Sequence, residues 1–269
     1  MRLVWEMVHP WPSLATTAAA GGFGLLLGLG WSDPRLGAIM ATVLMTQLSI
    51  STLNDWADRA RDAAAGRKKP LVLGHLPSGV ALGLAILFAL FTLPGMLAFG
   101  AVPGIVVLIG LASGWFYDLW AKPTPFSFLP FAIAFPLLPT WVGLIAGRPP
   151  GSFAWLVIAG AFLAVAIHLA DGLPDIETDA AAEIRPLAVA LGRDQSIRVM
   201  LGCALAGSLV VVAALASRPL IAIAVGVTAL VAVSLLARVA RTRPAHARWI
   251  AAMPAVVAAV ALLPRIDHA

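Results

Sequence analysis

The feature that most constrains the fold of this chain is a series of apolar stretches, each about as long as a membrane is thick. Of its 269 residues, 61% are hydrophobic and only 12% are charged, whereas soluble domains contain about 25% charged residues. A helix needs roughly 20 apolar residues to cross the hydrocarbon layer of a bilayer. We therefore predict an all-α, polytopic membrane protein without a sizeable soluble domain.

Proline, glycine and charged residues divide the apolar sequence into segments of suitable length. We predict nine transmembrane helices, at roughly 12–31, 36–58, 78–98, 100–120, 125–147, 152–172, 193–216, 219–238 and 247–265. These helices are expected to form a single integral-membrane domain, residues 1–269, around a central cavity.

The basic residues are distributed unequally over this layout. With the N-terminus in the cytoplasm, fourteen of the 18 lysine and arginine residues fall on the cytoplasmic side and four on the other. This asymmetry follows the positive-inside rule for short loops. Topology thus accounts for the net charge of +5, and we expect no nucleic-acid partner.

Two polar motifs with the same spacing lie at the ends of predicted spans on the cytoplasmic side. Each motif has oxygen-bearing side chains at positions i, i+4 and i+8, which would form one stripe along a helix. The residues are Asn54, Asp58 and Asp62 in the first motif and Asp171, Asp175 and Asp179 in the second. Carboxylates near the membrane interior need a partner such as a cation. Two such stripes would hold divalent cations, and the cations would hold an anionic ligand.

The motifs belong to a faint internal repeat. Lys69-Pro70-Leu71 follows the first motif, and Arg185-Pro186-Leu187 follows the second. We therefore predict two pseudo-repeated units, at about 36–98 and 152–216, because duplicated units in membrane proteins tend to face each other across a central site. Coincidence between two similar cytoplasmic loops is the alternative.

The donor atoms of the motifs suit magnesium. Mg²⁺ prefers oxygen ligands and is usually held by a few carboxylates together with substrate phosphates. The candidate ligands, which lie deepest in the two stripes, are Asn54, Asp58, Asp171 and Asp175. A diphosphate bridged by such ions is a good leaving group, because the metal stabilises the charge that develops as the C–O bond breaks.

The remaining charged residues near the motifs have two possible roles. Asp62 and Asp179 lie nearer the water and could pair with arginine or lysine. Arg67, Lys69 and Arg185 could close over the phosphates, although membrane topology alone also explains basic residues in these loops.

With these motifs, the sequence resembles the UbiA-type intramembrane prenyltransferase superfamily. The matching segments are Asn54-Asp55-x-x-Asp58-x-x-x-Asp62, Asp171-x-x-x-Asp175-x-x-x-Asp179, and the run from Arg185 to Gly192. Tyr117 and Lys122 stand where the family has a tyrosine and a basic residue near the diphosphate. The predicted topology agrees as well, so the resemblance covers nearly the whole chain.

The resemblance implies transfer of a prenyl group from a prenyl diphosphate to a lipophilic or aromatic acceptor, within a helical bundle open to the bilayer. It implies that two Mg²⁺ ions bind Asn54, Asp58, Asp171 and Asp175. Asp58, Asp171, Asp175, Tyr117 and Lys122 would be the catalytic residues. The substrate-binding residues would be Lys122, Arg67, Lys69, Arg185, Asp62 and Asp179.

The sequence departs from the family pattern at three positions in the cytoplasmic loops. Lys69 replaces the usual arginine, Glu183 stands where glycine is common, and Pro186 stands where a hydroxyl residue is frequent. These differences leave the metal ligands unchanged and affect the loops that would close over the phosphates.

Two other functions are compatible with paired acidic motifs in a membrane. A membrane terpene cyclase would use the same diphosphate chemistry within one molecule. An ion-coupled transporter would place its acids near the middle of the bilayer, whereas these acids lie at span ends beside basic loops. His168, three residues before Asp171, could contact the acceptor, act as a base, or serve in packing. The motifs do not encode the acceptor, the prenyl chain length or the oligomeric state.

Overall fold

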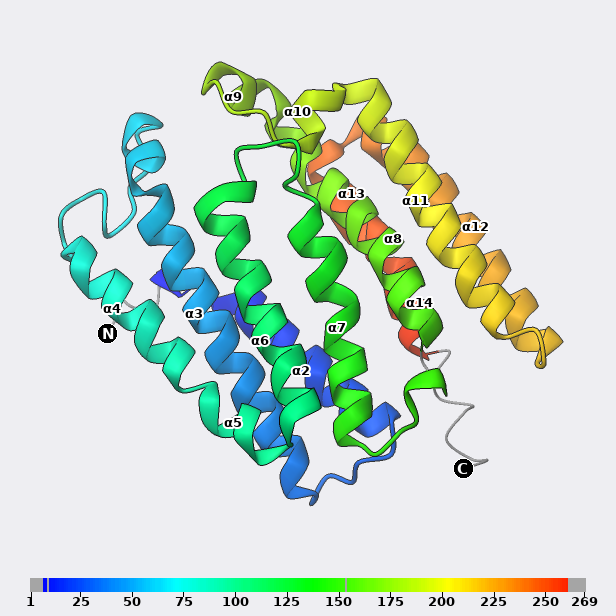
Figure 1. Cartoon of the computed structure of the whole chain (residues 1–269). Coiled ribbons are helices and arrows are strands. Elements are labelled where there is room, and N and C mark those ends of the chain that lie inside the picture. Colours follow the sequence, from blue (N-terminus) through cyan, green and yellow to red (C-terminus); the bar gives the residue numbers. More distant parts are fainter. Residues whose placement is uncertain (1–6, 9, 153, 261–269) are drawn as a thin grey trace. The chain divides into compact units, whose positions relative to one another are not determined.

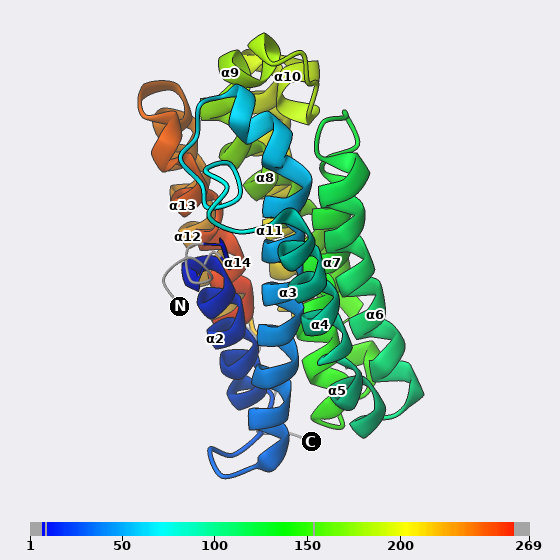
Figure 2. The same ribbon diagram turned by 90° about the vertical axis from the view of Figure 1, so that its left-hand side faces the viewer.

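The structure is a computed structural model that describes residues 7, 8, 10–152 and 154–260. Over these residues the chain is helical and contains no strand (Figures 1 and 2). In chain order the α-helices are α2 (Pro10–Leu26), α3 (Pro34–Ala64), α4 (Ser78–Leu90), α5 (Leu93–Ala98), α6 (Ala101–Phe116), α7 (Leu129–Ile145), α8 (Ala154–Gly172), α9 (Ile176–Ala181), α10 (Leu187–Leu191), α11 (Arg193–Ala214), α12 (Pro219–Thr242), α13 (Ala247–Ala251) and α14 (Met253–Val260). The helices form two compact units, with the division between Leu119 and Trp120.

The prediction of an integral, multi-pass membrane protein is confirmed. Among the residues described, six helical segments are long and apolar enough to cross a bilayer: Pro34–Ala64, Ser78–Ala98, Ala101–Ala121, Ala154–Ala181, Arg193–Ala214 and Pro219–Thr242. Shorter helices stand at the remaining predicted spans, namely α2, α7 and the pair α13 and α14. Large apolar side chains such as Leu97 and Leu220 are 81% and 82% exposed, as expected of surfaces that face lipid.

Several predicted spans differ in detail from the helices. The span predicted at 78–98 consists of α4 and α5, because Pro94 in the first turn of α5 cannot continue the preceding helix. The span predicted at 100–120 is α6 followed by one π-helical turn, Tyr117–Ala121. Residues 261–265 of the last predicted span lie outside the described residues.

Helix α3 is the centre of the first unit and packs against α2, α4, α5 and α6. Its start is defined by Asp33, whose side chain accepts a hydrogen bond from the backbone N–H of Arg35. The helix has 31 residues and is therefore about 46 Å long, longer than the hydrocarbon layer of about 30 Å. The last three turns of this helix carry the first acidic motif.

Helix α8 is the centre of the second unit and packs against α7, α11, α13 and α14. Leu169, Leu173 and Met200 belong to the apolar core near its C-terminal end. Helix α11 approaches α8 closely at Gly207, where an added Cβ would lie 2.8 Å from Cγ of Leu163. The close packing of α8 thus fixes the end of the helix from which the second acidic motif begins.

Candidate active site

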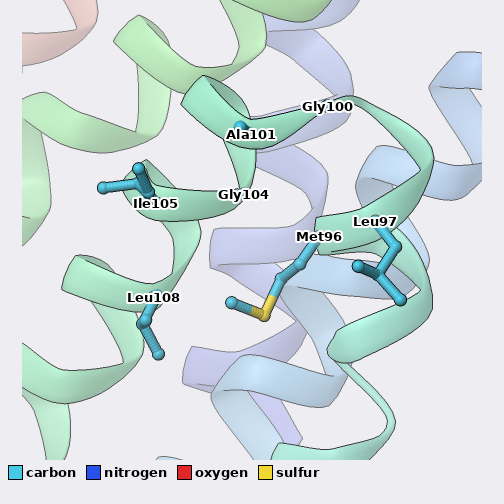
Figure 3. A pocket seen from close by; sticks show the side chains of 7 residues that line it. All are labelled: Met96, Leu97, Gly100, Ala101, Gly104, Ile105 and Leu108. Carbon is cyan, nitrogen blue, oxygen red and sulfur yellow. The ribbon is translucent and has the colours of Figure 1, made fainter.

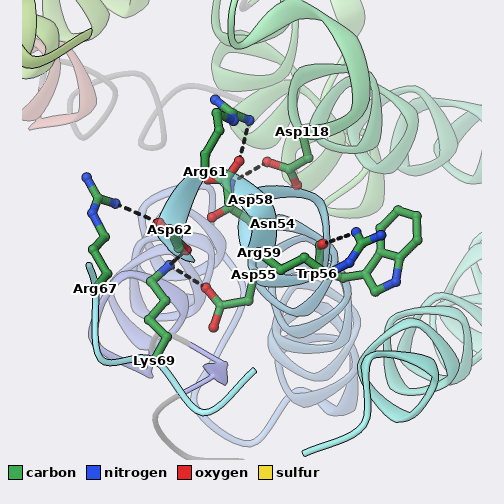
Figure 4. A network of polar contacts seen from close by, with 10 residues as sticks. All are labelled: Asn54, Asp55, Trp56, Asp58, Arg59, Arg61, Asp62, Arg67, Lys69 and Asp118. Atoms are coloured by element: carbon green, nitrogen blue, oxygen red, sulfur yellow. Dashed lines mark hydrogen bonds and ion pairs between the residues drawn. The ribbon is translucent and has the colours of Figure 1, made fainter. Parts of the chain in front are cut away.

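The first acidic cluster lies at the C-terminal end of α3 and comprises Asn54, Asp55, Asp58, Asp62 and, from the π-helical turn, Asp118 (Figure 4). Its four carboxylates are buried, with exposed fractions of 2% to 5%. A buried carboxylate is costly unless it is paired or hydrogen-bonded. The partners of these side chains therefore define what the cluster can bind.

Lys69 and Arg67, on the loop that follows α3, neutralise two of these carboxylates. The Lys69 ammonium lies 2.7 Å from Oδ1 of Asp55 and 2.8 Å from Oδ2 of Asp62, and Arg67 lies 3.1 Å from Oδ1 of Asp62. Burial alone would lower the pKa of Lys69, but its hydrogen bonds to Asp55 and Asp62 outweigh this effect and raise the pKa above its usual value. The loop is thereby tied to the end of the helix.

Helix geometry explains why Asp62 shares a partner with Asp55. At about 100° per residue, Asp62 is turned by about 80° from Asn54 but by only about 20° from Asp55. The stripe of Asn54, Asp58 and Asp62 therefore winds around the helix, and its last member reaches the face that carries Asp55. Asp62 thus pairs with the basic residues of the loop, while Asn54 and Asp58 lie on a different part of the helix surface.

Asn54 and Asp58 have polar partners of a different kind. The amide nitrogen of Asn54 donates a hydrogen bond of 2.7 Å to Oδ1 of Asp118. Asp58 forms an ion pair with Arg61, one turn further along α3. Asp118 did not emerge from the sequence as a site residue. The available signal was its position directly after Tyr117, in an otherwise apolar helix end.

The second acidic motif does not lie on one continuous helix. Helix α8 ends at Gly172, Leu173–Asp175 form a 3₁₀-helical turn with Pro174 near its start, and α9 begins at Ile176. The proline lacks the N–H that a continuous α-helix would need here. The expected single stripe is therefore interrupted, and Asp179 lies in α9, beyond the break.

Asp171 and Asp175 nevertheless line one hollow of about 250 Å³, together with Arg248 from the start of α13. Both aspartates are exposed, unlike the carboxylates of the first cluster. Arg248 lies 3.2 Å from Oδ1 of Asp171. The sequence marked Arg248 only as a cytoplasmic basic residue, because a separation of 77 positions from Asp171 leaves no local signal of contact.

Backbone contacts bring the segment that contains Arg185 next to the segment that contains Lys122. The Arg185 N–H donates a hydrogen bond of 3.0 Å to the carbonyl of Pro123, the residue after Lys122. The Leu187 N–H donates a second bond, also of 3.0 Å, to the hydroxyl of Ser127. Lys122 and Arg185, which are far apart in the sequence, therefore belong to two segments of backbone that lie next to each other.

His168 belongs to the same set of contacts. Its Nε2 lies at hydrogen-bond distance, 2.9 Å, from the Ser127 hydroxyl, which also accepts the hydrogen bond from the Leu187 N–H. The Phe131 ring packs 4.6 Å from the imidazole, centroid to centroid. The imidazole is thus buried and in contact with two side chains, and its role as acceptor contact, base or packing residue stays a prediction.

Two other residues of the loops have informative conformations. Glu183 has φ 58°, in the left-handed region that favours glycine, which matches the position where the family usually has glycine. Tyr117 begins the π-helical turn and is half-buried.

The predicted site residues are divided between the two units. Asn54, Asp58, Asp62, Arg67, Lys69 and Tyr117 lie in the first, and Lys122, Asp171, Asp175, Asp179 and Arg185 lie in the second. In the described part of the chain, no three histidine, cysteine or carboxylate side chains form a group that could hold a metal ion. A metal site built from both motifs therefore stays a prediction from the sequence.

A separate hollow of about 390 Å³ lies in the first unit, beside α5 and α6 (Figure 3). Its lining consists of Met96, Leu97, Gly100, Ala101, Gly104, Ile105 and Leu108. None of these side chains is charged or carries a hydrogen-bond donor, so the lining supplies no side-chain partner for an anion.

Fold and motifs together define a multi-pass helical membrane protein with two acidic motifs of matched spacing. Known structures share this fold. One, from work on digeranylgeranylglyceryl phosphate synthase, is 13% identical, covers 98% of each chain and has a TM-score of 0.79. A UbiA homologue from Aeropyrum pernix K1 is 16% identical over 94% of this chain and 98% of its own, with a TM-score of 0.75. A UbiA homologue from Archaeoglobus fulgidus, bound to DMAPP and Mg²⁺, is 16% identical over 97% and 99%, with a TM-score of 0.73.

The sequence itself identifies the family. The UbiA prenyltransferase family matches residues 13–262, and the chain belongs to this family. No curated protein matches the sequence.

Proposed function

We propose that this protein transfers a prenyl group from a prenyl diphosphate to a lipophilic or aromatic acceptor, in a reaction that depends on Mg²⁺. The observation that carries the proposal is the pair of acidic motifs with matched spacing, each accompanied by basic residues on a neighbouring loop. The Archaeoglobus fulgidus homologue of the same fold, bound to DMAPP and Mg²⁺, supports the choice of substrate and metal.

The side chains of the two motifs fit the metal by their chemistry. Asn54, Asp58, Asp171 and Asp175 supply only oxygen donors once the amide nitrogen of Asn54 is engaged by Asp118. Such a donor set suits Mg²⁺, which takes a few carboxylates and completes its shell with phosphate oxygens and water. When bound, the metal would stabilise the charge on the departing diphosphate.

The basic residues would bind the diphosphate and hold it while the bond to the prenyl group breaks. The C1–O bond breaks with its electron pair leaving on the diphosphate, the acceptor forms a bond to C1, and the acceptor then loses a proton. Lys122 and Arg185, with Tyr117, would contact the diphosphate in this scheme. Arg67 would approach from the loop after α3. Lys69 would contribute at most one N–H donor to the diphosphate, because two of its three N–H groups are directed to Asp55 and Asp62.

The proposed site opens toward the cytoplasm. Both acidic motifs and the loops after them lie at the ends of spans that the positive-inside rule assigns to the cytoplasmic face. A charged, water-soluble diphosphate group would thus reach the site from the cytoplasm, while the prenyl chain lies in the membrane.

Purified protein incubated with radiolabelled geranyl diphosphate, a lipid extract and Mg²⁺ tests the proposal. We expect release of diphosphate and label bound to an acceptor, and we expect both to vanish with EDTA. Asp58→Ala and Asp171→Ala should abolish turnover without loss of fold, whereas Glu177→Ala, at an acid that is 87% exposed and outside the ligand set, should not. Full activity of Asp58→Ala or Asp171→Ala would remove these residues from the metal site.

The same experiment separates the alternatives. A cyclase would release diphosphate and convert the label into a hydrocarbon without any added acceptor. An ion-coupled transporter would release no diphosphate at all.

A further inference from the structure

Asp118 is a buried carboxylate that the proposed reaction does not yet use. It is 3% exposed, and its Oδ1 accepts a hydrogen bond of 2.7 Å from the amide nitrogen of Asn54, 64 residues earlier in the chain. We propose that Asp118 is a positioning residue that fixes the side-chain amide of Asn54 with its oxygen directed to the metal. This inference rests on the proposed function.

The packing of α3 against α6 explains why Asp118 meets Asn54. Along this seam the indole N–H of Trp115 donates a hydrogen bond of 3.0 Å to the hydroxyl of Ser49. At Gly114 the helices are so close that an added Cβ would collide with the side chain of Ile50. Asp118 and Asn54 each lie four residues, about one turn, beyond Gly114 and Ile50. The two helices thus run in the same direction, and the hydrogen bond between Asn54 and Asp118 follows the same pairing one turn further along.

The π-helical turn adds a second reason for the position of Asp118. The turn Tyr117–Ala121 replaces the α-helix directly after Phe116, and π-helical turns are frequent at functional sites. Within it Asp118 is buried, whereas its neighbour Leu119 is 54% exposed. The turn therefore buries the carboxylate of Asp118 and leaves the apolar side chain of Leu119 at the surface.

A carboxylate is well suited to orient an amide. The amide group of asparagine has a donor side and an acceptor side, whereas an ionised carboxylate only accepts hydrogen bonds. In the structure the NH₂ group of Asn54 faces Asp118, so the amide oxygen points away from it. Groups that orient a metal ligand in this manner typically change metal affinity 10- to 100-fold when they are mutated.

Calorimetric titration of geranyl diphosphate into the full-length protein, over a series of Mg²⁺ concentrations, measures the effect without turnover. We expect Asp118→Leu to weaken the Mg²⁺ dependence of binding by about 10- to 100-fold. Asp118→Asn should retain most of the affinity, because its amide oxygen can still accept the bond from Asn54. Thermal unfolding in EDTA checks that each variant is folded.

An exchange of the two side chains gives a test that a purely structural role would not pass. Asn54→Asp alone places two carboxylates against each other and should weaken the Mg²⁺ dependence. The double variant Asn54→Asp/Asp118→Asn lets the amide at position 118 donate to the carboxylate at position 54, and it should bind at least about tenfold better than the single variant. The comparison of the single variant Asn54→Asp with the double variant tests the positioning role of Asp118 even if Asp118→Leu fails to fold.

The outcomes distinguish this inference from the function on which it rests. If wild-type protein binds geranyl diphosphate equally with Mg²⁺ and with EDTA, the proposed function is wrong and the role of Asp118 is wrong with it. If wild-type binding depends on Mg²⁺ but folded Asp118→Leu behaves like wild type, or the exchange gives no rescue, the positioning role alone is overturned.

Discussion

Removing the positive charge of Lys69 should destabilise the protein far more than removing that of its neighbour Lys68. The ammonium of Lys69 joins Asp55 and Asp62, whose side chains are 2% and 3% exposed. Loss of one partner of a buried ion pair costs about 3–5 kcal/mol, because the other charge stays buried without compensation. Lys69 itself is 24% exposed, so water relieves part of this penalty, and we expect a cost of about 2–4 kcal/mol for Lys69→Met.

The assay is thermal unfolding in detergent micelles, combined with hydrogen exchange over residues 65–77. For chains of this size a loss of 1 kcal/mol lowers the Tm by about 2–4 °C, so Lys69→Met should lower it by at least about 4 °C. Hydrogen exchange should accelerate in the loop, since the ion pairs tie it to α3. Lys68→Met is the matched control, because Lys68 is exposed, and Lys69→Arg should preserve most of the stability.

The contribution of Lys69 also has a defined pH dependence. Its pKa in the folded protein lies above the ordinary value of 10.5, owing to its bonds to Asp55 and Asp62, which outweigh the opposite effect of burial. A raised pKa means that the stabilisation is complete below pH 10.5 and disappears as the pH rises through the folded value. Equal Tm values for Lys69→Met and Lys68→Met at neutral pH, or no difference in loop exchange, would refute this reasoning.

Three further predictions concern packing, backbone and topology. Gly207→Ala should lower the Tm, because the new Cβ meets Leu163 in α8, whereas Gly202→Ala on the same helix has open space and should not; equal effects would contradict the close approach of α8 and α11. Glu183→Gly should raise stability by up to about 1 kcal/mol, measured by thermal unfolding, because it relieves a left-handed backbone conformation; an unchanged or lower Tm would count against this strain. In a cysteine-free background, Lys68→Cys should react with impermeant thiol reagents only from the cytoplasm, and Arg148→Cys only from the other side; labelling of both from one side would refute the predicted orientation.

The sequence predicted the helical elements well because membrane spans are a local property. Twenty apolar residues must form a helix in lipid, since no water is present to satisfy their backbone groups. The break after Gly172 was also visible in principle, because Pro174 interrupts the apparent stripe of Asp171, Asp175 and Asp179. The regular spacing of the acids concealed this break.

Partner choice inside the site was not predictable in the same way. The bonds from Asn54 to Asp118 and from Arg248 to Asp171 join residues 64 and 77 positions apart. Such contacts depend on which helices pack together, and on details such as the close approach at Gly114. Lys69 could be identified as a basic residue near the motif, but its burial between two carboxylates follows from the course of the loop, which sequence spacing alone does not define.

The length of α3 would link the proposed site to the thickness of the surrounding membrane. At 31 residues, or about 46 Å, this helix exceeds a hydrocarbon layer of about 30 Å by roughly 16 Å. Asn54 and Asp58 lie in the last three turns of α3, so the acyl-chain length of the host lipids would set how deeply these two side chains sit below the headgroups. A thicker bilayer would draw them toward the hydrocarbon, and mismatch of this kind costs fractions of a kcal/mol per Å. Under the proposed function, the metal affinity of the site would therefore depend on the lipid as well as on the protein.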